Sequence, residues 1–133
     1  YNITIQKVDV TAPFKAVLVW TDYPGTPGAG TMLVNDLDFT VTDPQGTLYY
    51  GNDFSAPYNT AYDRKNNIEV VKIDAPVSGT YSLHIKAQNV PSPTQPFAVV
   101  VTYDEFVPQG AGTNTVGTVR NCTYVFGTGQ LTC

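Results

Sequence analysis

Ten prolines are spread over the chain, and they leave no stretch in which a long helix fits. They stand at positions 13, 24, 27, 44, 57, 76, 91, 93, 96 and 108. A proline inside a helix removes a backbone hydrogen bond and collides with the preceding turn. No window of about a dozen residues shows the 3.6-residue apolar repeat of a surface helix. The chain is therefore expected to build its core from strands.

Apolar and polar residues alternate along much of the chain, as in strands with one buried face. The run over residues 14–20 is more continuously apolar, which is typical of a central strand. In residues 36–41, Leu37, Phe39 and Val41 point to one face, and Asp36, Asp38 and Thr40 point to the other. We predict strands over residues 3–10, 14–20, 36–41, 47–50, 68–73, 81–86 and 97–103.

Turn residues join these strands. Asp43-Pro44-Gln45-Gly46 places Pro and Gly where a tight turn favours them, and residues 75–79 do the same before the strand that follows. Two longer loops cover residues 22–33 and 51–67, and long loops in a compact domain are often functional. Seven or eight short strands with such connections predict an all-β fold, an antiparallel β-sandwich of jelly-roll type with about eight strands.

The length of 133 residues corresponds to one domain, which we place at residues 1–107. Residues 108–117 have the composition of a flexible linker. Residues 118–133 read as a C-terminal hairpin that contains the two cysteines of the chain, Cys122 and Cys133. Their closeness and the absence of a CxxC spacing favour a disulfide over a metal or redox site.

The net charge of −4 argues against a nucleic-acid partner, which would call for a basic face. No apolar run is long enough to span a bilayer, so no membrane partner is expected. Sequons at Asn2 and Asn121, with the expected disulfide, favour secretion to the extracellular space. The chain begins at Tyr1 rather than Met, and we expect it to be part of a longer protein.

Catalysis by this chain alone is not expected. The only histidine, His84, falls at a strand position that points away from the core. No GxSxG or Gly-Thr-Ser nucleophile motif occurs, so a Ser-His-Asp arrangement lacks its parts. A glycosidase with two carboxylates has enough aspartates, but a small sandwich leaves little chain to build its cleft.

The acidic residues point to a calcium site. Nine of the eleven acids are Asp, and several stand at predicted strand ends. Alternate strand ends meet at one edge of a sandwich, and Ca²⁺ prefers mixed oxygen ligands from such loops. Asp and Asn are also ordinary turn residues, so the pattern alone leaves both readings open. The candidate ligands are Asp22, Asn35, Asp36, Asp38, Asp53, Asp63, Asn67 and Glu69.

Aromatic residues crowd the same long loops: Tyr23, Tyr49, Tyr50, Phe54, Tyr58 and Tyr62. An exposed aromatic rim binds sugars or proteins. Aromatic rings in a loop also serve simply to pack the loop down. A binding module for carbohydrate or protein is thus the alternative function.

Several motifs resemble the C-terminal β-jelly-roll, P-domain-like domain of secreted subtilisin-like serine proteases. They are Val34-Asn35-Asp36-Leu37-Asp38 and the downstream Asn66-Asn67-Ile68-Glu69, with further matches within residues 3–103. The resemblance implies a noncatalytic domain, calcium-binding in some members, that packs on an upstream protease catalytic domain and stabilises it. It also implies that the parent protein is a subtilisin-like serine endopeptidase and that this chain lacks the catalytic triad. A polymeric protein or carbohydrate substrate is the further partner that we consider.

Overall fold

The computed structural model describes residues 1–7, 10–102, 122–125 and 130–132, which contain strands and no helix. It follows that no helix among them is long and apolar enough to cross a membrane. The strands are β1 (Asn2–Lys7), β2 (Phe14–Trp20), β3 (Asp36–Thr42), β4 (Leu48–Tyr50), β5 (Ile68–Ile73), β6 (Gly79–Asn89), β7 (Phe97–Thr102), β8 (Cys122–Val125) and β9 (Gln130–Thr132).

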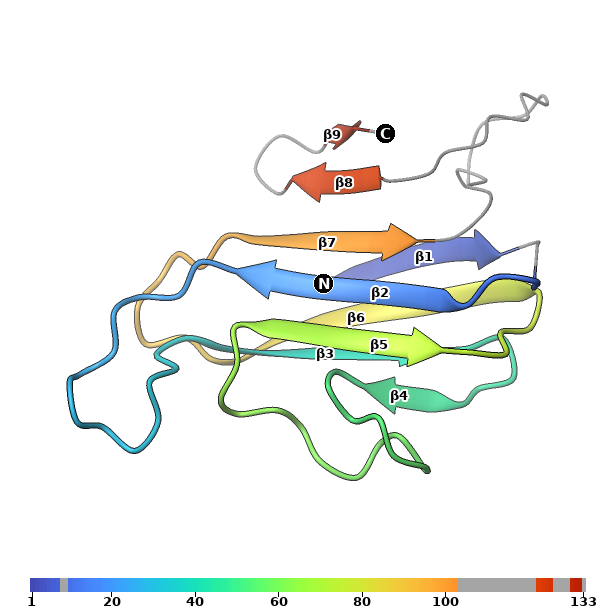
Figure 1. Cartoon of the computed structure of the whole chain (residues 1–133). Coiled ribbons are helices and arrows are strands. Elements are labelled where there is room, and N and C mark those ends of the chain that lie inside the picture. Colours follow the sequence, from blue (N-terminus) through green and yellow to red (C-terminus); the bar gives the residue numbers. More distant parts are fainter. Residues whose placement is uncertain (8–9, 103–121, 126–129, 133) are drawn as a thin grey trace.

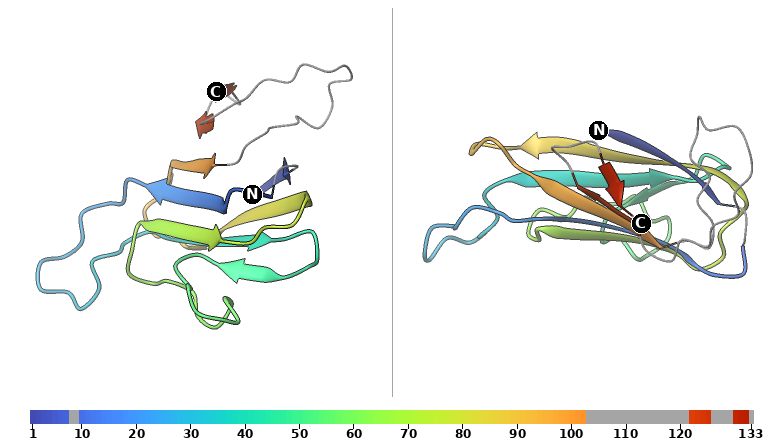
Figure 2. Two further views of the ribbon diagram at one scale, coloured as in Figure 1. Left: turned by 45° about the vertical axis from the view of Figure 1, so that its right-hand side comes forward. Right: turned by 90° about the horizontal axis from the view of Figure 1, so that it is seen from above.

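The strands form two antiparallel sheets that pack face to face (Figure 1). One sheet has the order β1-β6-β3-β4 and the other the order β5-β2-β7-β8-β9. The view from above separates the two layers (Figure 2). The chain crosses repeatedly between the sheets, so that strands distant in sequence become neighbours. The predicted all-β sandwich is confirmed.

Two predicted strands, residues 14–20 and 68–73, have the observed bounds of β2 and β5. β6 is longer than the predicted 81–86 because it serves two neighbours. Its first part pairs with β1, from Gly79 to His84, and its later part pairs with β3 as far as Asn89. The long strand therefore holds one sheet together.

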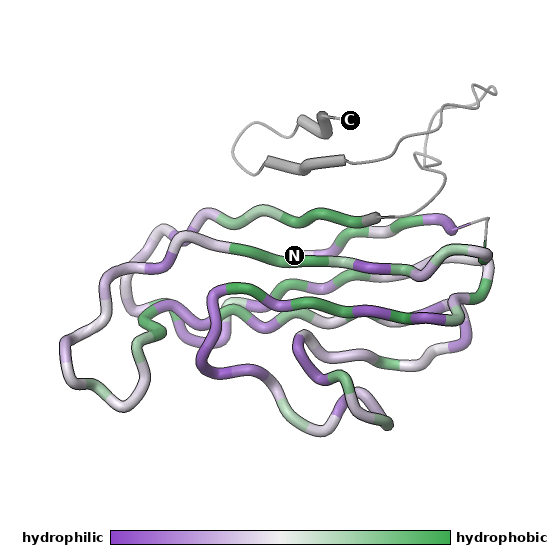
Figure 3. The backbone as a smooth tube through the Cα atoms, viewed as in Figure 1, coloured by the Kyte–Doolittle hydropathy of each residue, from purple (hydrophilic) through white to green (hydrophobic). Residues whose placement is uncertain are grey.

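The core lies between the sheets and is built from the apolar positions of the alternating pattern, which Figure 3 shows as interleaved green segments. Phe14 of β2 stacks on Tyr81 of β6, with ring centroids 4.5 Å apart, and this contact joins the two sheets. Both rings are fully buried. Removing either would leave a cavity at the centre of the domain.

The second face of β3 is buried as well, which the alternation did not predict. Asp38 and Thr40 are almost inaccessible to solvent although they point away from the core. Arg64, from the loop of residues 51–67, bonds to Asp38 and covers this face. The long loop thus contributes to the burial of Asp38 at this end of the sandwich.

The predicted turn at residues 43–46 is confirmed and joins β3 to β4. The N–H of Gly46 donates to the carbonyl of Asp43 at 3.0 Å, and Gly46 has a φ of 85°, which favours glycine. Oδ1 of Asp43 also accepts the N–H groups of Gln45 and Thr47. The aspartate therefore fixes the turn through its side chain.

The C-terminal part is described only as β8, which pairs with β7, and β9, which pairs with β8. The linker predicted at 108–117 and the sequon at Asn121 lie outside the described residues. Cys133 lies outside them as well, and Cys122 is described by its backbone alone. The domain boundaries and the disulfide stay predictions.

Candidate functional site

The candidate site lies at the end of the sandwich where β2 ends and β3 and β5 begin. Val19 of β2 pairs with Ile68 of β5, so the antiparallel register brings the end of one strand beside the start of the other. The loop of residues 21–35 leaves and re-enters the sandwich here, and the loop of residues 51–67 returns to it here (Figure 1). The expected convergence of strand ends is therefore present.

Asp36 and Asp38 share one cation, and that cation is the guanidinium of Arg64. Nη1 of Arg64 lies 3.2 Å from Oδ2 of Asp36 and donates a hydrogen bond to Oδ1 of Asp38. The Asp38 side chain is 3% exposed, whereas that of Arg64 is 41% exposed. Loss of the guanidinium would leave a buried carboxylate without a compensating charge. The two aspartates, which are two residues apart on β3, therefore contact the same guanidinium.

Glu69 is fully buried and only half satisfied. Its Oε2 accepts a hydrogen bond from the N–H of Phe39 at 2.9 Å. Its Oε1 has no hydrogen-bond partner among the described residues. Burial, opposed in part by the Phe39 hydrogen bond, raises the pKa of Glu69 to about 8. This carboxyl group therefore retains a proton through much of the neutral range.

Asp63 precedes Arg64 in the loop and interacts electrostatically with the same carboxylates. Burial acts to raise the pKa of Asp63, but hydrogen bonds, chiefly from the side chains of Asn66 and Asn52, outweigh it and lower the pKa. We call the following set the acidic cluster: Asp36, Asp38, Asp63 and Glu69. Arg64 is the cation that the cluster holds.

Asp22 and Asn35 fasten the base of the loop of residues 21–35. Oδ1 of Asp22 accepts the N–H of Asn35 at 2.8 Å, and Oδ2 accepts the N–H of Val34 at 2.7 Å. The amide of Asn35 bonds to Ser92 in both directions, through Nδ2 to the carbonyl and through Oδ1 to the N–H. These groups are hydrogen-bonded to main chain, which is the structural use of Asp and Asn in loops.

Asn67 and Asp53 also serve the loops. Nδ2 of Asn67 donates to the carbonyl of Trp20 at 2.8 Å, and the N–H of Trp20 donates to the carbonyl of Asn67. This pairing extends the ladder between β2 and β5 by one residue. Oδ2 of Asp53 accepts both the N–H and the hydroxyl of Thr60 at 2.7 Å. These hydrogen bonds lower the pKa of Asp53.

The described part of the chain has no group of three or more His, Cys, Asp and Glu placed to hold a metal ion. The eight candidate ligands are divided between the acidic cluster, the Asp22–Asn35 network and the separate contacts of Asn67 and Asp53. The acidic cluster nevertheless suits Ca²⁺ in its chemistry, because its donors are all carboxylate oxygens. One of them, Oε1 of Glu69, is buried and has no partner in the part of the chain that the structure describes. As it stands, the cluster binds Arg64.

Three residues of the site are not among the candidate ligands: Gly51, Asn52 and Arg64. Arg64 is one of only seven basic residues and stands among acids, so a charge-pairing argument was the available signal. Gly51 is buried against Glu69. Asn52 has a φ of 61°, a conformation that Asn tolerates better than most residues.

Asn52 covers part of the free edge of β5. Its N–H donates to the carbonyl of Val70 at 2.9 Å, and its Oδ1 accepts the N–H of Val70 at 2.9 Å. Its Nδ2 donates to the carbonyl of Ile68 at 2.8 Å. One residue therefore satisfies three main-chain groups that a neighbouring strand would otherwise bond.

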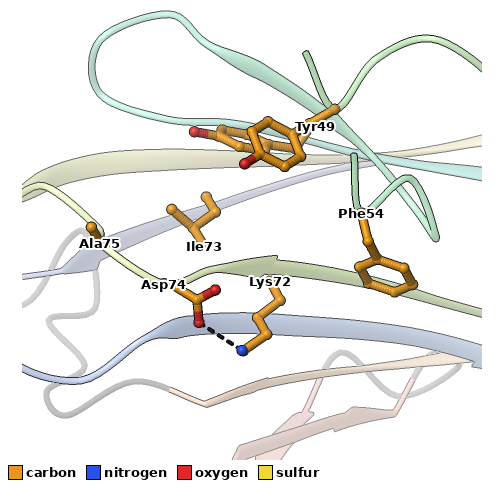
Figure 4. Close-up of a pocket in the computed structure, with 7 residues that line it drawn as sticks. Tyr49, Phe54, Lys72, Ile73, Asp74 and Ala75 are labelled. Carbon is orange, nitrogen blue, oxygen red and sulfur yellow. Dashed lines mark ion pairs between the residues drawn. The ribbon is translucent and has the colours of Figure 1, made fainter. Parts of the chain in front are cut away.

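An aromatic pocket of about 470 Å³ opens next to this edge, between β4 and the end of β5 (Figure 4). We use the name aromatic pocket for the space lined by Tyr49, Phe54, Tyr58, Lys72, Ile73, Asp74 and Ala75. Phe54 is 62% exposed. Nζ of Lys72 and Oδ1 of Asp74 form an ion pair of 2.6 Å at the surface.

The other loop aromatics mostly pack against each other. Tyr50 stacks on Tyr62 with centroids 4.0 Å apart, and the guanidinium of Arg64 lies 4.9 Å from the centroid of Tyr62. Tyr49 and Tyr58 meet with centroids 5.5 Å apart. These rings stabilise the loop of residues 51–67. The stacked Tyr62 also holds Arg64 over the acidic cluster.

His84 is exposed on β6, as its strand position predicted, and Asn2 is exposed on the edge strand β1. Asn2 is thus accessible as the asparagine of a sequon. Asn2 pairs with His84 in the register of the two strands.

No family model matches this chain. The chain is 37% identical over 101 residues, 71% of its length, to the serine protease/ABC transporter B family protein tagA of Dictyostelium discoideum. It is 33% identical over 97 residues, 64% of its length, to the protein tagD of the same family and organism. The chain spans only 6% and 5% of the lengths of these relatives. It is therefore similar to one small part of each of two long proteins whose names include a serine protease.

Proposed function

We propose that this chain is a noncatalytic accessory domain of a secreted, subtilisin-like serine protease and that it stabilises the parent enzyme. The observation that carries the proposal is the similarity to a small part of two proteins named as serine proteases. A sandwich that encloses its own core suits an appended domain. The motifs at residues 34–38 and 66–69, which resemble those of C-terminal jelly-roll domains of subtilisin-like proteases, add support.

The parent protein tests this role. The gene upstream of Tyr1 should encode a protease domain with a Gly-Thr-Ser nucleophile motif. Deleting the domain from the parent should speed its thermal inactivation while leaving activity at low temperature largely intact. A parent that inactivates at the same rate without the domain would contradict the stabilising role. The 133-residue chain alone should not hydrolyse peptides.

Calcium binding is the second part of the proposal. Asp36, Asp38 and Glu69 would hold the ion, with Asp63 beside them, after Arg64 has moved away. The support is an all-carboxylate donor set with one buried oxygen that lacks a partner. Ca²⁺ that binds only the folded state stabilises it by about 2.7 kcal/mol at a hundredfold excess over the Kd. Calorimetric scans in CaCl₂ and in EDTA test this, and an unchanged Tm would end the calcium proposal.

The second candidate function is a binding module for carbohydrate or protein, and the aromatic pocket favours it. An exposed ring beside a concave surface is typical of binding sites. Retention of the chain on insoluble polysaccharides, collagen or keratin would support this function. Passage through all of these matrices would count against it.

A further inference from the structure

Among the described strands, β5 pairs with β2 alone, and the residues that the structure describes cover its other edge only in part. In an antiparallel ladder the main-chain groups of successive residues point alternately to the two sides of a strand. Those of Ile68 and Val70 point away from β2, because they bond to Asn52. Those of Lys72, two residues further along, point the same way and lie beyond the reach of Asn52.

The contacts of Asn52 show what kind of group this edge accepts. At Val70 the edge is bonded in both directions, by a main-chain N–H and by a carboxamide oxygen. At Ile68 it is bonded by the carboxamide nitrogen. All the groups that fill the edge are thus amides placed as a strand would place them. Another amide at Lys72 would continue the row.

The aromatic pocket begins where this covered part of the edge ends. Lys72, Ile73 and Asp74 form one wall of the pocket, and Tyr49 and Phe54 lie across from them (Figure 4). Tyr58 also lines the pocket. In an extended chain bonded at Lys72, side chains would project alternately to the two faces of the new strand. One of those positions lies over the pocket. The exposed ion pair of Lys72 and Asp74 is weak enough to rearrange for an arriving chain.

We propose that this edge binds an extended polypeptide segment, which pairs with the main chain of Lys72 and places an aromatic or large aliphatic side chain in the aromatic pocket. Main-chain hydrogen bonds would supply part of the affinity and the pocket would supply the selectivity. The N–H and carbonyl of Lys72, which bond to none of the described residues beyond β2, match a peptide group, and this favours a polypeptide over a saccharide. The inference rests on the binding-module candidate and names its ligand class.

Three probes test the inference on the full, ¹⁵N-labelled chain. They are the blocked peptide acetyl-Thr-Val-Phe-Val-Thr-amide, the same peptide with Asp in place of Phe, and cellopentaose. The Phe peptide should shift the Lys72 amide resonance in a saturable titration and slow its hydrogen exchange. The Asp peptide should bind at least about tenfold more weakly, because its side chain is charged. Cellopentaose should leave the Lys72 amide unchanged.

Two pairs of variants locate the contact. Lys72→Pro and Lys72→Ala both remove the lysine side chain, but only Lys72→Pro removes the outward N–H. Lys72→Pro should therefore bind the Phe peptide about fivefold or more weakly than Lys72→Ala does. Phe54→Ala should weaken binding about tenfold, and Tyr23→Ala, which removes an exposed ring outside the pocket, should not. If Lys72→Pro does not fold, Phe54→Ala and the Lys72 amide shift decide the question.

The opposite outcomes are clear-cut. An unchanged Lys72 amide at saturating Phe peptide, or equal binding by Lys72→Pro and Lys72→Ala, would overturn the inference. A response to cellopentaose alone would overturn it and leave the binding-module function standing as a carbohydrate module. No response to any probe, together with no retention on the insoluble matrices, would overturn both the inference and the binding-module function.

Discussion

Gly51 lies directly against the carboxylate of Glu69. A Cβ atom on Gly51 would overlap Oε2 of Glu69 and lie 2.6 Å from its Cβ. The N–H of Gly51 donates to the carbonyl of Phe39, and the N–H of Phe39 donates to Oε2 of Glu69. The missing side chain at Gly51 is therefore what lets a buried carboxyl group lie between the two sheets.

Gly51→Ala is expected to lower the free energy of unfolding by about 1–3 kcal/mol, because the added methyl group overpacks a buried site. Urea denaturation measures this. Gly30→Ala is the matched control, since no atom lies within 4 Å of a Cβ there. The double variant with Glu69→Ala should recover part of the loss. Strictly additive effects would show that the contact with Glu69 is not the cause.

The raised pKa of Glu69 predicts a stability that declines with pH. The folded state holds a proton near pH 7 that the unfolded state has released above its usual pKa of 4.5. The contribution of this group therefore falls as pH rises from about 5 through about 8. The Glu69→Gln variant has no titrating group at this position. Its free energy of unfolding should exceed that of the wild type by on the order of 2 kcal/mol near pH 9 and should be nearly the same near pH 5. Urea curves in EDTA at both pH values measure this, and a constant difference between the two proteins would contradict it.

In EDTA, Arg64→Met is expected to lower the free energy of unfolding by about 1–2 kcal/mol, because the buried carboxylate of Asp38 loses its ion-pair partner. The loss stays this small because solvent partly screens the exposed guanidinium. If the acidic cluster binds Ca²⁺, the same variant should gain more in Tm from CaCl₂ than the wild type gains, since no guanidinium competes for the carboxylates. Lys65→Met removes a neighbouring exposed charge and serves as control. Equal gains in all three proteins would show that Arg64 and Ca²⁺ do not compete.

Asn52→Ala should lower the free energy of unfolding by about 2 kcal/mol or more. The variant loses the side-chain hydrogen bonds to β5, and alanine tolerates a φ of 61° less well than asparagine does. Glycine adopts that φ readily, so Asn52→Gly should lower the free energy of unfolding by about half as much. Thermal denaturation separates the two contributions. Light scattering should also detect more association in both variants, since the edge of β5 is then open. Two equally destabilised variants would show that backbone conformation plays no part.

Much of the fold was predictable because its signals are local. Alternation of side chains located the strands, and Asp43 with Gly46 located a turn that needs little outside support. At the site, alternation placed Asp36 and Asp38 on one face of the strand, and in the structure both contact one cation. The identity of that cation was not predictable from local pattern. Arg64 is 26 residues from Asp38 in sequence, and only the packed loop brings them together.

The burial of Asp38 and Thr40 was unpredictable for the same reason. A two-residue alternation assigns a residue to a face but does not say what covers that face. Here a loop without any strand of its own covers it. The pairing of Asn52 with β5 likewise depends on a side-chain amide acting in place of main chain, and no strand pattern records that.

Residues 51–67 belong to no strand, yet they close one face of β3 through Arg64 and one edge of β5 through Asn52. An insertion in this segment would disturb both sheets at once. The loop of residues 21–35 is different, because Asp22 and Asn35 tie only its base and its tip around Gly28 and Gly30 faces open space. An epitope tag or a fluorescent label therefore belongs at that tip. Among related sequences of this domain, we expect the length of the segment 51–67 to be conserved and the length of the loop 21–35 to vary.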